Sequence, residues 1–136
     1  MSNSLSVLIC EDDDAIRGLL SKLLSRHGLA VESVATGAEA IERIRRRPYD
    51  LVLLDLLTPS VSGFEVLDLV ARERPYLLRG VIVVTACQAA INASLPVAAL
   101  LRKPFDIEVF DTIVERVLHT SEEDSCRQHR RPAPSW

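Results

Sequence analysis

Short aliphatic runs alternate with longer amphipathic segments along most of this 136-residue chain. The runs, which we predict as strands, cover residues 5–10, 30–34, 51–54, 81–84 and 97–101. The segments that follow them, which we predict as helices from their amphipathic pattern, cover residues 14–26, 36–46, 64–74 and 106–119. A further helix is expected in the short, poorly patterned stretch 88–94. Near-continuous apolar strands that each precede a helix indicate a parallel sheet with helices on both faces. We therefore predict a single three-layer α/β domain.

The expected order of the strands determines which strand ends lie together. The run 30–34 is the least apolar, so we expect it at an edge of the sheet. Each crossover should be right-handed. We expect the strand order 2-1-3-4-5, which is a common order of doubly wound five-stranded sheets. The first and third strands lie side by side in this order. Open α/β sheets bind their ligands at that point, outside the carboxyl ends of the strands.

Single residues mark the predicted helix ends. Gly28 follows the segment 14–26 and suits the left-handed conformation that ends many helices. Thr36 and Glu39 have the spacing of a capping box and predict the start of the second helix. We interpret Asp14 as the cap of the first helix, where a carboxylate is favourable.

Charge and composition argue against several functions. The net charge of -3 provides no general attraction to nucleic acid or to anionic lipid. Arg43 and Arg46 each lie four positions after a glutamate, so the arginine-rich segment is expected to be a solvated helix face rather than a nucleic-acid patch. No apolar run approaches the roughly 20 residues that span a membrane.

The cysteines and the N-terminal segment indicate a reduced protein of the cytoplasm. Cys10, Cys87 and Cys126 are odd in number and lack the spacing of a metal or redox motif, and the N-terminal segment lacks the basic region of a signal peptide. Residues 121–136 are polar, contain proline and have no periodicity, so we predict a disordered tail or the start of a linker there. The folded domain would then be 1–120.

Polar side chains lie just after four of the predicted strands. Glu11 and Asp12 follow the first strand, Asp55 the third, Thr85 the fourth and Lys103 the fifth. Since these strand ends meet at one edge of the sheet, three carboxylates should converge with a hydroxyl and an ammonium group.

Such a cluster needs positive charge, because close carboxylates repel one another. A hard divalent cation suits an all-oxygen set of ligands, and Mg²⁺ accepts two or three protein oxygens with water completing its octahedron. A lysine, a threonine and a metal can together bind the oxygens of a phosphoryl group while a carboxylate acts as the nucleophile. The cluster therefore predicts phosphoryl-transfer chemistry.

Four segments in order carry a resemblance to a known family. They read VLICEDDDAIR, DLVLLDLLTPSVSGFEVL, VIVVTA and LRKPFD. Together they resemble the receiver domain of two-component response regulators, over about residues 6–118. The resemblance implies a flavodoxin-like fold, and it implies a cis peptide bond between Lys103 and Pro104.

The same resemblance implies a role for each residue of the cluster. Asp55 would be the phosphoacceptor, with Thr85 and Lys103 on the phosphoryl oxygens. The metal, Mg²⁺ or Mn²⁺, would be held by carboxylates of the acidic cluster and by one backbone carbonyl. These ligands are Glu11, Asp12, Asp55 and the carbonyl of Leu57.

The function implied is that of a stand-alone signalling switch. Its phosphoryl group would come from a sensor histidine kinase or a histidine phosphotransfer protein, and its output would go to an unknown downstream protein, without direct contact to nucleic acid or membrane. The domain would not be an enzyme beyond its own phosphotransfer and a slow self-dephosphorylation.

Two other functions are compatible with parts of this pattern. The first is a receiver-like interaction module that ignores phosphorylation. The second is a phosphatase of the haloacid dehalogenase type, which the sequence disfavours because Leu57 stands where the second aspartate of the DxD motif should be.

The chain departs from the family pattern at several positions. Thr85 and Lys103 are only 18 positions apart, which predicts a shortened fourth helix. Leu100 occupies the position of the usual aromatic switch residue, so the readout of phosphorylation should differ from that of the family. Leu57 and Cys87 flank the expected path of the hydrolytic water and are poorly suited to orient it, which predicts slow loss of phosphate.

Overall fold

The computed structural model describes the backbone of residues 4–87 and 95–130, and the side chains of this part up to residue 120. Five strands and five helical segments make up the described chain: β1 (Ser6–Cys10), α1 (Asp14–Arg26), β2 (Ala30–Val34), α2 (Gly37–Arg46), β3 (Leu51–Leu54), α3 (Gly63–Glu73), the 3₁₀ helix η1 (Pro75–Gly80), β4 (Val81–Thr85), β5 (Ala99–Arg102) and α5 (Ile107–Arg130). The predicted helix 88–94 lies outside the described residues.

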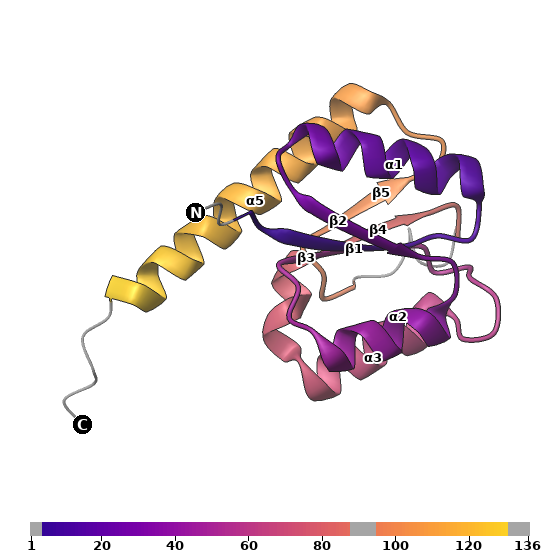
Figure 1. Ribbon diagram of the computed structural model, residues 1–136, viewed down its shortest axis with the longest axis horizontal. Helices are drawn as coiled ribbons and strands as arrows, with labels where there is room; N and C mark the ends of the chain where they lie inside the picture. Colours follow the sequence, from indigo (N-terminus) through magenta and orange to yellow (C-terminus); the bar gives the residue numbers. More distant parts are fainter. Residues whose placement is uncertain (1–3, 88–94, 131–136) are drawn as a thin grey trace.

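The strands form one parallel sheet in the order β2-β1-β3-β4-β5, as predicted (Figure 1). The least apolar strand, β2, lies at one edge and β5 at the other. Cys10 of β1 lies beside Leu54 of β3, so these two central strands end at the same level. The residues that follow them are thereby brought together.

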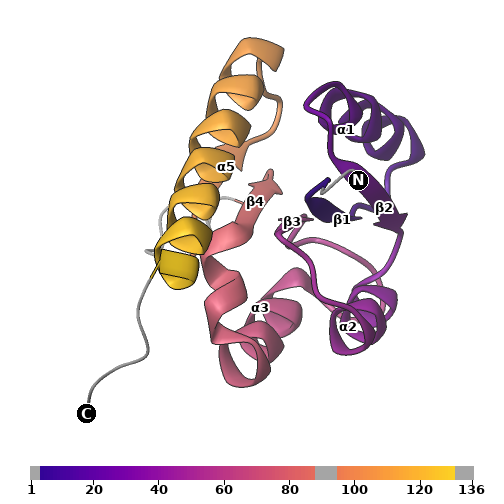
Figure 2. The ribbon, with the colours of Figure 1, turned by 60° about the vertical axis from the view of Figure 1, so that its left-hand side comes forward.

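Helices cover both faces of the sheet, and alternate residues of each strand pack on opposite faces. Figure 2 shows α1 and α2 on opposite sides of β1. Val7 and Ile9 of β1 pack with α1 and α5, where Phe110 is fully buried. Leu8 and Cys10 pack with α2 and α3. The fold is therefore the predicted three-layer α/β arrangement, with two aliphatic cores separated by the sheet.

Local interactions correct several predicted boundaries. The N-cap of α1 is Asp13, not Asp14, because the Asp13 carboxylate accepts a hydrogen bond from the Ile16 amide at 3.0 Å. Thr36 caps α2 as predicted, accepting from the Glu39 amide at 3.2 Å. The strand β5 begins at Ala99 rather than at residue 97.

The C-terminal helix continues well past its predicted end at residue 119. It reaches Arg130, and Figure 1 shows α5 extending beyond the body of the domain. The helix thus includes residues 121–130, where we predicted a disordered tail or the start of a linker, whereas 131–136 lie outside the described residues. No glycine or proline interrupts the sequence between Ile107 and Pro132, so nothing in the sequence ends the helix where its apolar face ends.

Within the part of the chain that the structure describes, no helix is long and apolar enough to cross a membrane.

Candidate functional site

Three carboxylates converge at the carboxyl ends of β1 and β3. The Asp55 amide donates to the Cys10 carbonyl at 3.1 Å, which continues the pairing of the two strands into the site. Glu11, Asp12 and Asp55 place carboxylate oxygens within 4.8 Å of one another. Glu11 and Asp55 are only 1% and 6% exposed, whereas Asp12 is exposed. The sequence-based prediction that these side chains meet is therefore confirmed.

Lys103 bridges two of these carboxylates. Its Nζ lies 2.5 Å from Glu11 Oε1 and 3.0 Å from Asp55 Oδ2. The Lys103 amide donates to the Thr85 carbonyl at 3.0 Å, and the following bond to Pro104 is cis, as the family resemblance implied. The ammonium group thus supplies positive charge to a site that contains three negative ones.

Thr85 completes the set of hydrogen bonds to Asp55. Its hydroxyl donates to Asp55 Oδ1 at 3.2 Å and accepts from the Cys87 amide at the same distance. The Leu57 amide also donates to Asp55 Oδ1, at 3.0 Å. Both oxygens of Asp55 are therefore held, Oδ1 by two neutral donors and Oδ2 by the lysine.

Burial and charge act against each other in this site. Burial raises the pKa of Glu11 by more than the hydrogen bonds from Lys103 and the Asp13 amide lower it. Burial alone would lower the pKa of Lys103, but its hydrogen bonds to Glu11 and Asp55 prevail and raise it. The ammonium charge is thus stabilised, while the Glu11 carboxylate carries a net cost in the folded protein.

Two residues that the sequence analysis missed hold Glu11 in place. The Asp13 amide donates to Glu11 Oε2 at 3.2 Å, and the Arg17 guanidinium donates to the Glu11 backbone carbonyl at 2.9 Å. Arg17 also pairs with Asp14. Both contacts connect the start of α1 to the end of β1. They depend on the geometry of the turn between these elements, which cannot be predicted from residue spacing alone.

Gly63 allows α3 to begin directly against the backbone of the phosphoacceptor segment. Its amide donates to the Leu56 carbonyl at 3.0 Å. A Cβ atom on Gly63 would lie 2.5 Å from both the Asp55 carbonyl oxygen and Leu56 Cα, far inside normal contact distance. The position of Asp55 therefore depends on the absence of a side chain at residue 63.

The donor set fits a hard divalent cation. Its three carboxylates are oxygen ligands, and the exposed Asp12 leaves one side open to the water molecules that Mg²⁺ retains. The role of the Leu57 backbone carbonyl as a further ligand remains a prediction. The side chain of Leu57 is 57% exposed beside the site.

Fold and site together define a doubly wound α/β protein with an acidic, lysine-bridged centre between its two central strands. The sequence model of the response regulator receiver domain matches residues 7–115. The chain therefore belongs to the response regulator receiver domain family of two-component systems.

Curated relatives are longer than this chain. The transcriptional regulatory protein AfsQ1 of Streptomyces coelicolor is 32% identical over 124 residues, a match that covers 88% of this chain and 54% of AfsQ1. The DNA-binding transcriptional regulator NtrC of Escherichia coli K12 is 31% identical over 134 residues, which is 95% of this chain and 28% of NtrC. The chain thus spans about half the length of these relatives, or less.

Solved receiver domains share the fold over nearly their whole length. The CheY-like receiver domain protein of Methanospirillum hungatei has a TM-score of 0.78 at 26% identity, covering 90% of this chain and 99% of that one. The response regulator TrrA of Thermotoga maritima, solved in complex with Mg²⁺-BeF, has a TM-score of 0.74 at 25% identity, covering 83% of this chain and 98% of that one.

Proposed function

We propose that this receiver accepts a phosphoryl group on Asp55 from a sensor histidine kinase or a histidine phosphotransfer protein, in a reaction that requires Mg²⁺ or Mn²⁺. The observation that carries the proposal is the set of contacts to Asp55. Lys103 and Thr85 hold its two oxygens, and the acidic pair Glu11 and Asp12 lies beside it. The carboxylate nucleophile of Asp55 thus lies beside an ammonium group, a hydroxyl donor and a candidate metal site.

The chemistry follows from these contacts. An oxygen of Asp55 attacks the phosphorus, the new O–P bond forms, and the N–P bond to the donor imidazole breaks. A bound Mg²⁺ supplies positive charge for the phosphoryl oxygens, and it would be held by Glu11, Asp12, Asp55 and the Leu57 carbonyl. Because phosphorylation removes the charge of the Asp55 carboxylate, the Lys103 ammonium can turn to a phosphoryl oxygen.

Thr85 provides the contact that changes between the two states. Its hydroxyl now donates to Asp55 Oδ1, and in the phosphorylated state it would donate to a phosphoryl oxygen instead. This change would shift Thr85 at the end of β4 and, through its hydrogen bond from the Cys87 amide, Cys87. We propose that the domain is a switch read by a downstream protein and not an enzyme acting on another substrate.

Residues 7–115 contain every group that this reaction needs, so the receiver is proposed to act as a switch by itself. DNA binding, which the name of NtrC includes, is not proposed for the described residues. Arginines of α2 and of the residue that follows it are engaged by carboxylates: Arg43 and Arg47 both bind Glu32, for example. The free thiols of Cys10 and Cys87 support the proposal that the protein acts in the cytoplasm.

The test is phosphorylation by acetyl phosphate with Mg²⁺, followed by intact mass. We expect one added phosphoryl group in the wild type, none in Asp55→Asn, and none in EDTA. Asp68→Asn is the matched control, since Asp68 is an exposed aspartate on α3 and should not affect the reaction. Phosphate on Asp55→Asn, or equal labelling in EDTA, would show that the assignment is wrong.

One residue, Leu100, favours an alternative function. Leu100, half-buried in β5, stands where the family has its aromatic switch residue, which favours an interaction module that does not depend on phosphorylation. In that case the wild type would take up no phosphate in the same experiment, although it folds and binds Mg²⁺.

A further inference from the structure

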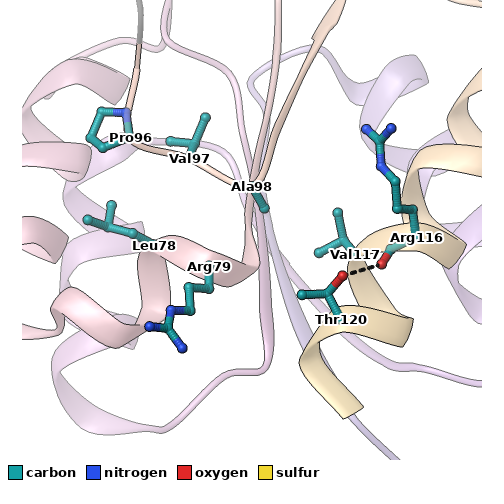
Figure 3. A pocket seen from close by; sticks show the side chains of 8 residues that line it. All are labelled: Leu78, Arg79, Pro96, Val97, Ala98, Arg116, Val117 and Thr120. Atoms are coloured by element: carbon teal, nitrogen blue, oxygen red, sulfur yellow. Dashed lines mark hydrogen bonds between the residues drawn. The ribbon is translucent and has the colours of Figure 1, made fainter. Parts of the chain in front are cut away.

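A cavity of about 290 Å³ lies at the amino ends of β4 and β5, at the opposite end of the sheet from Asp55 (Figure 3). The Ala98 amide donates to the Val81 carbonyl at 2.9 Å and fixes this corner of the sheet. The wall is built by η1, by the segment before β5 and by α5. Its lining residues are Leu78, Arg79, Pro96, Val97, Ala98, Arg116, Val117 and Thr120.

The lining combines hydrocarbon with positive charge. Apart from two arginines and one threonine, the described lining residues are apolar, and none of them is an aspartate or glutamate. Figure 3 shows Arg79 and Arg116 on opposite sides, with Ala98 between them. This local excess of positive charge is opposite in sign to the net charge of -3.

Arg116 differs from the arginines on the other face of the domain. In α2, Arg43 and Arg45 bind Glu32 and Glu73. The Arg116 backbone carbonyl accepts from the Thr120 hydroxyl at 3.0 Å, yet its guanidinium has no hydrogen bond or ion pair within the residues that the structure describes. Arg79 has interactions of its own, so Arg116 is the arginine that we consider as the ligand-binding group.

We propose that this cavity binds a small amphipathic carboxylate. The hydrocarbon part would pack against Val97, Ala98 and Val117, which removes apolar surface from water. The carboxylate would receive the paired N–H donors of Arg116, whose planar guanidinium matches it geometrically. The volume of about 290 Å³ is just below the usual range for ligand pockets, roughly 300–1,000 Å³, which favours a short acyl chain or a single ring.

The experiment is a titration of the ¹⁵N-labelled 136-residue protein with octanoate, observed by two-dimensional NMR. We expect saturable shifts of the amides of Val97, Ala98, Val117 and Thr120. Octanamide, which has the same shape without the charge, should bind about tenfold more weakly, as should octanoate to Arg116→Gln. Arg26→Gln is the matched control, because it removes the same charge from an exposed site on α1.

Three outcomes would overturn the proposal. Shifts elsewhere on the protein, or none that saturate, would show that octanoate does not occupy the cavity. Equal affinity for octanoate and octanamide would show that Arg116 does not recognise the charge. Shifts at the same amides upon changing the protein concentration, without octanoate, would show that a second copy of the chain covers this face. None of these results bears on Asp55, since acetyl phosphate labelling is measured separately.

Discussion

Replacing Lys103 by methionine should destabilise the metal-free protein strongly. Methionine keeps much of the side-chain length and removes the charge that bridges Glu11 and Asp55. The side chains of these two carboxylates are only 2% and 7% exposed, so water cannot replace the lost ammonium group. Removing one partner of a buried ion pair costs roughly 3–5 kcal/mol. Because the Lys103 side chain is itself 15% exposed, we expect the lower end, about 3 kcal/mol.

The effect should be visible as a shift in the melting temperature. Domains of this size lose roughly 3–4 °C in Tm for each kcal/mol, so Lys103→Met should melt about 10 °C below the wild type in EDTA. Lys22→Met, on the exposed surface of α1, is the matched control and should change the free energy of unfolding by no more than ~0.5 kcal/mol. The measurement is a thermal melt followed by circular dichroism.

Two further melts test the electrostatic cause. Mg²⁺ should raise the Tm of Lys103→Met more than that of the wild type, since the cation replaces the missing positive charge. Glu11→Gln should stabilise the metal-free protein, because the raised pKa of Glu11 means that its charged form is disfavoured in the fold. Combined with Lys103→Met, Glu11→Gln should also restore part of the stability that Lys103→Met removes. A Lys103→Met protein as stable as the wild type in EDTA would refute the reasoning.

Three other predictions follow. Gly63→Ala should lower the Tm and slow phosphorylation, because the added Cβ would collide with the backbone of Asp55 and Leu56. Gly18→Ala is the control: with open space around it, this change should raise the free energy of unfolding by about 0.5–1 kcal/mol. Equal melting temperatures for the two variants would contradict this prediction. The pKa of Cys10 is raised to about 12, chiefly by burial, so below pH 8 Ellman's reagent should modify it at least ~1,000-fold more slowly in the native than in the unfolded protein. Replacing Leu57 by Asn together with Cys87 by Glu should shorten the phosphorylated lifetime about tenfold, measured as phosphate loss after donor removal, and unchanged decay would argue against the hypothesis.

The sequence was sufficient to predict the parallel sheet and the residues that make up the site. The strands other than β2 are apolar runs that a doubly covered sheet can bury, and β2 could be placed at the edge because it is the least apolar run, with Glu32 and Ser33 within it. Glu11, Asp55 and Lys103 could be predicted to meet because parallel strands end at a common edge.

Contacts between elements were predicted less well. Spacing along α2 predicted an ion pair between Arg43 and Glu39, but Arg43 binds Glu32 on β2, at 2.8 Å. The Glu42–Arg46 pair was correct, since both residues lie on one helix. The bridge from Lys103 to Glu11 was not predicted, because nothing in either segment gives the direction of the lysine side chain.

The alternation of strand residues between two cores makes distance along the chain a poor guide to compensation between substitutions. Leu53 and Leu54 are consecutive, yet Leu53 packs with the layer of α1 and α5, and Leu54 with the layer of α2 and α3. A cavity created at Leu53 can be filled only from its own layer, for example by a larger residue at Val114, 61 positions further along the sequence. Correlated changes in this domain should therefore join distant residues of one layer more often than consecutive residues of one strand.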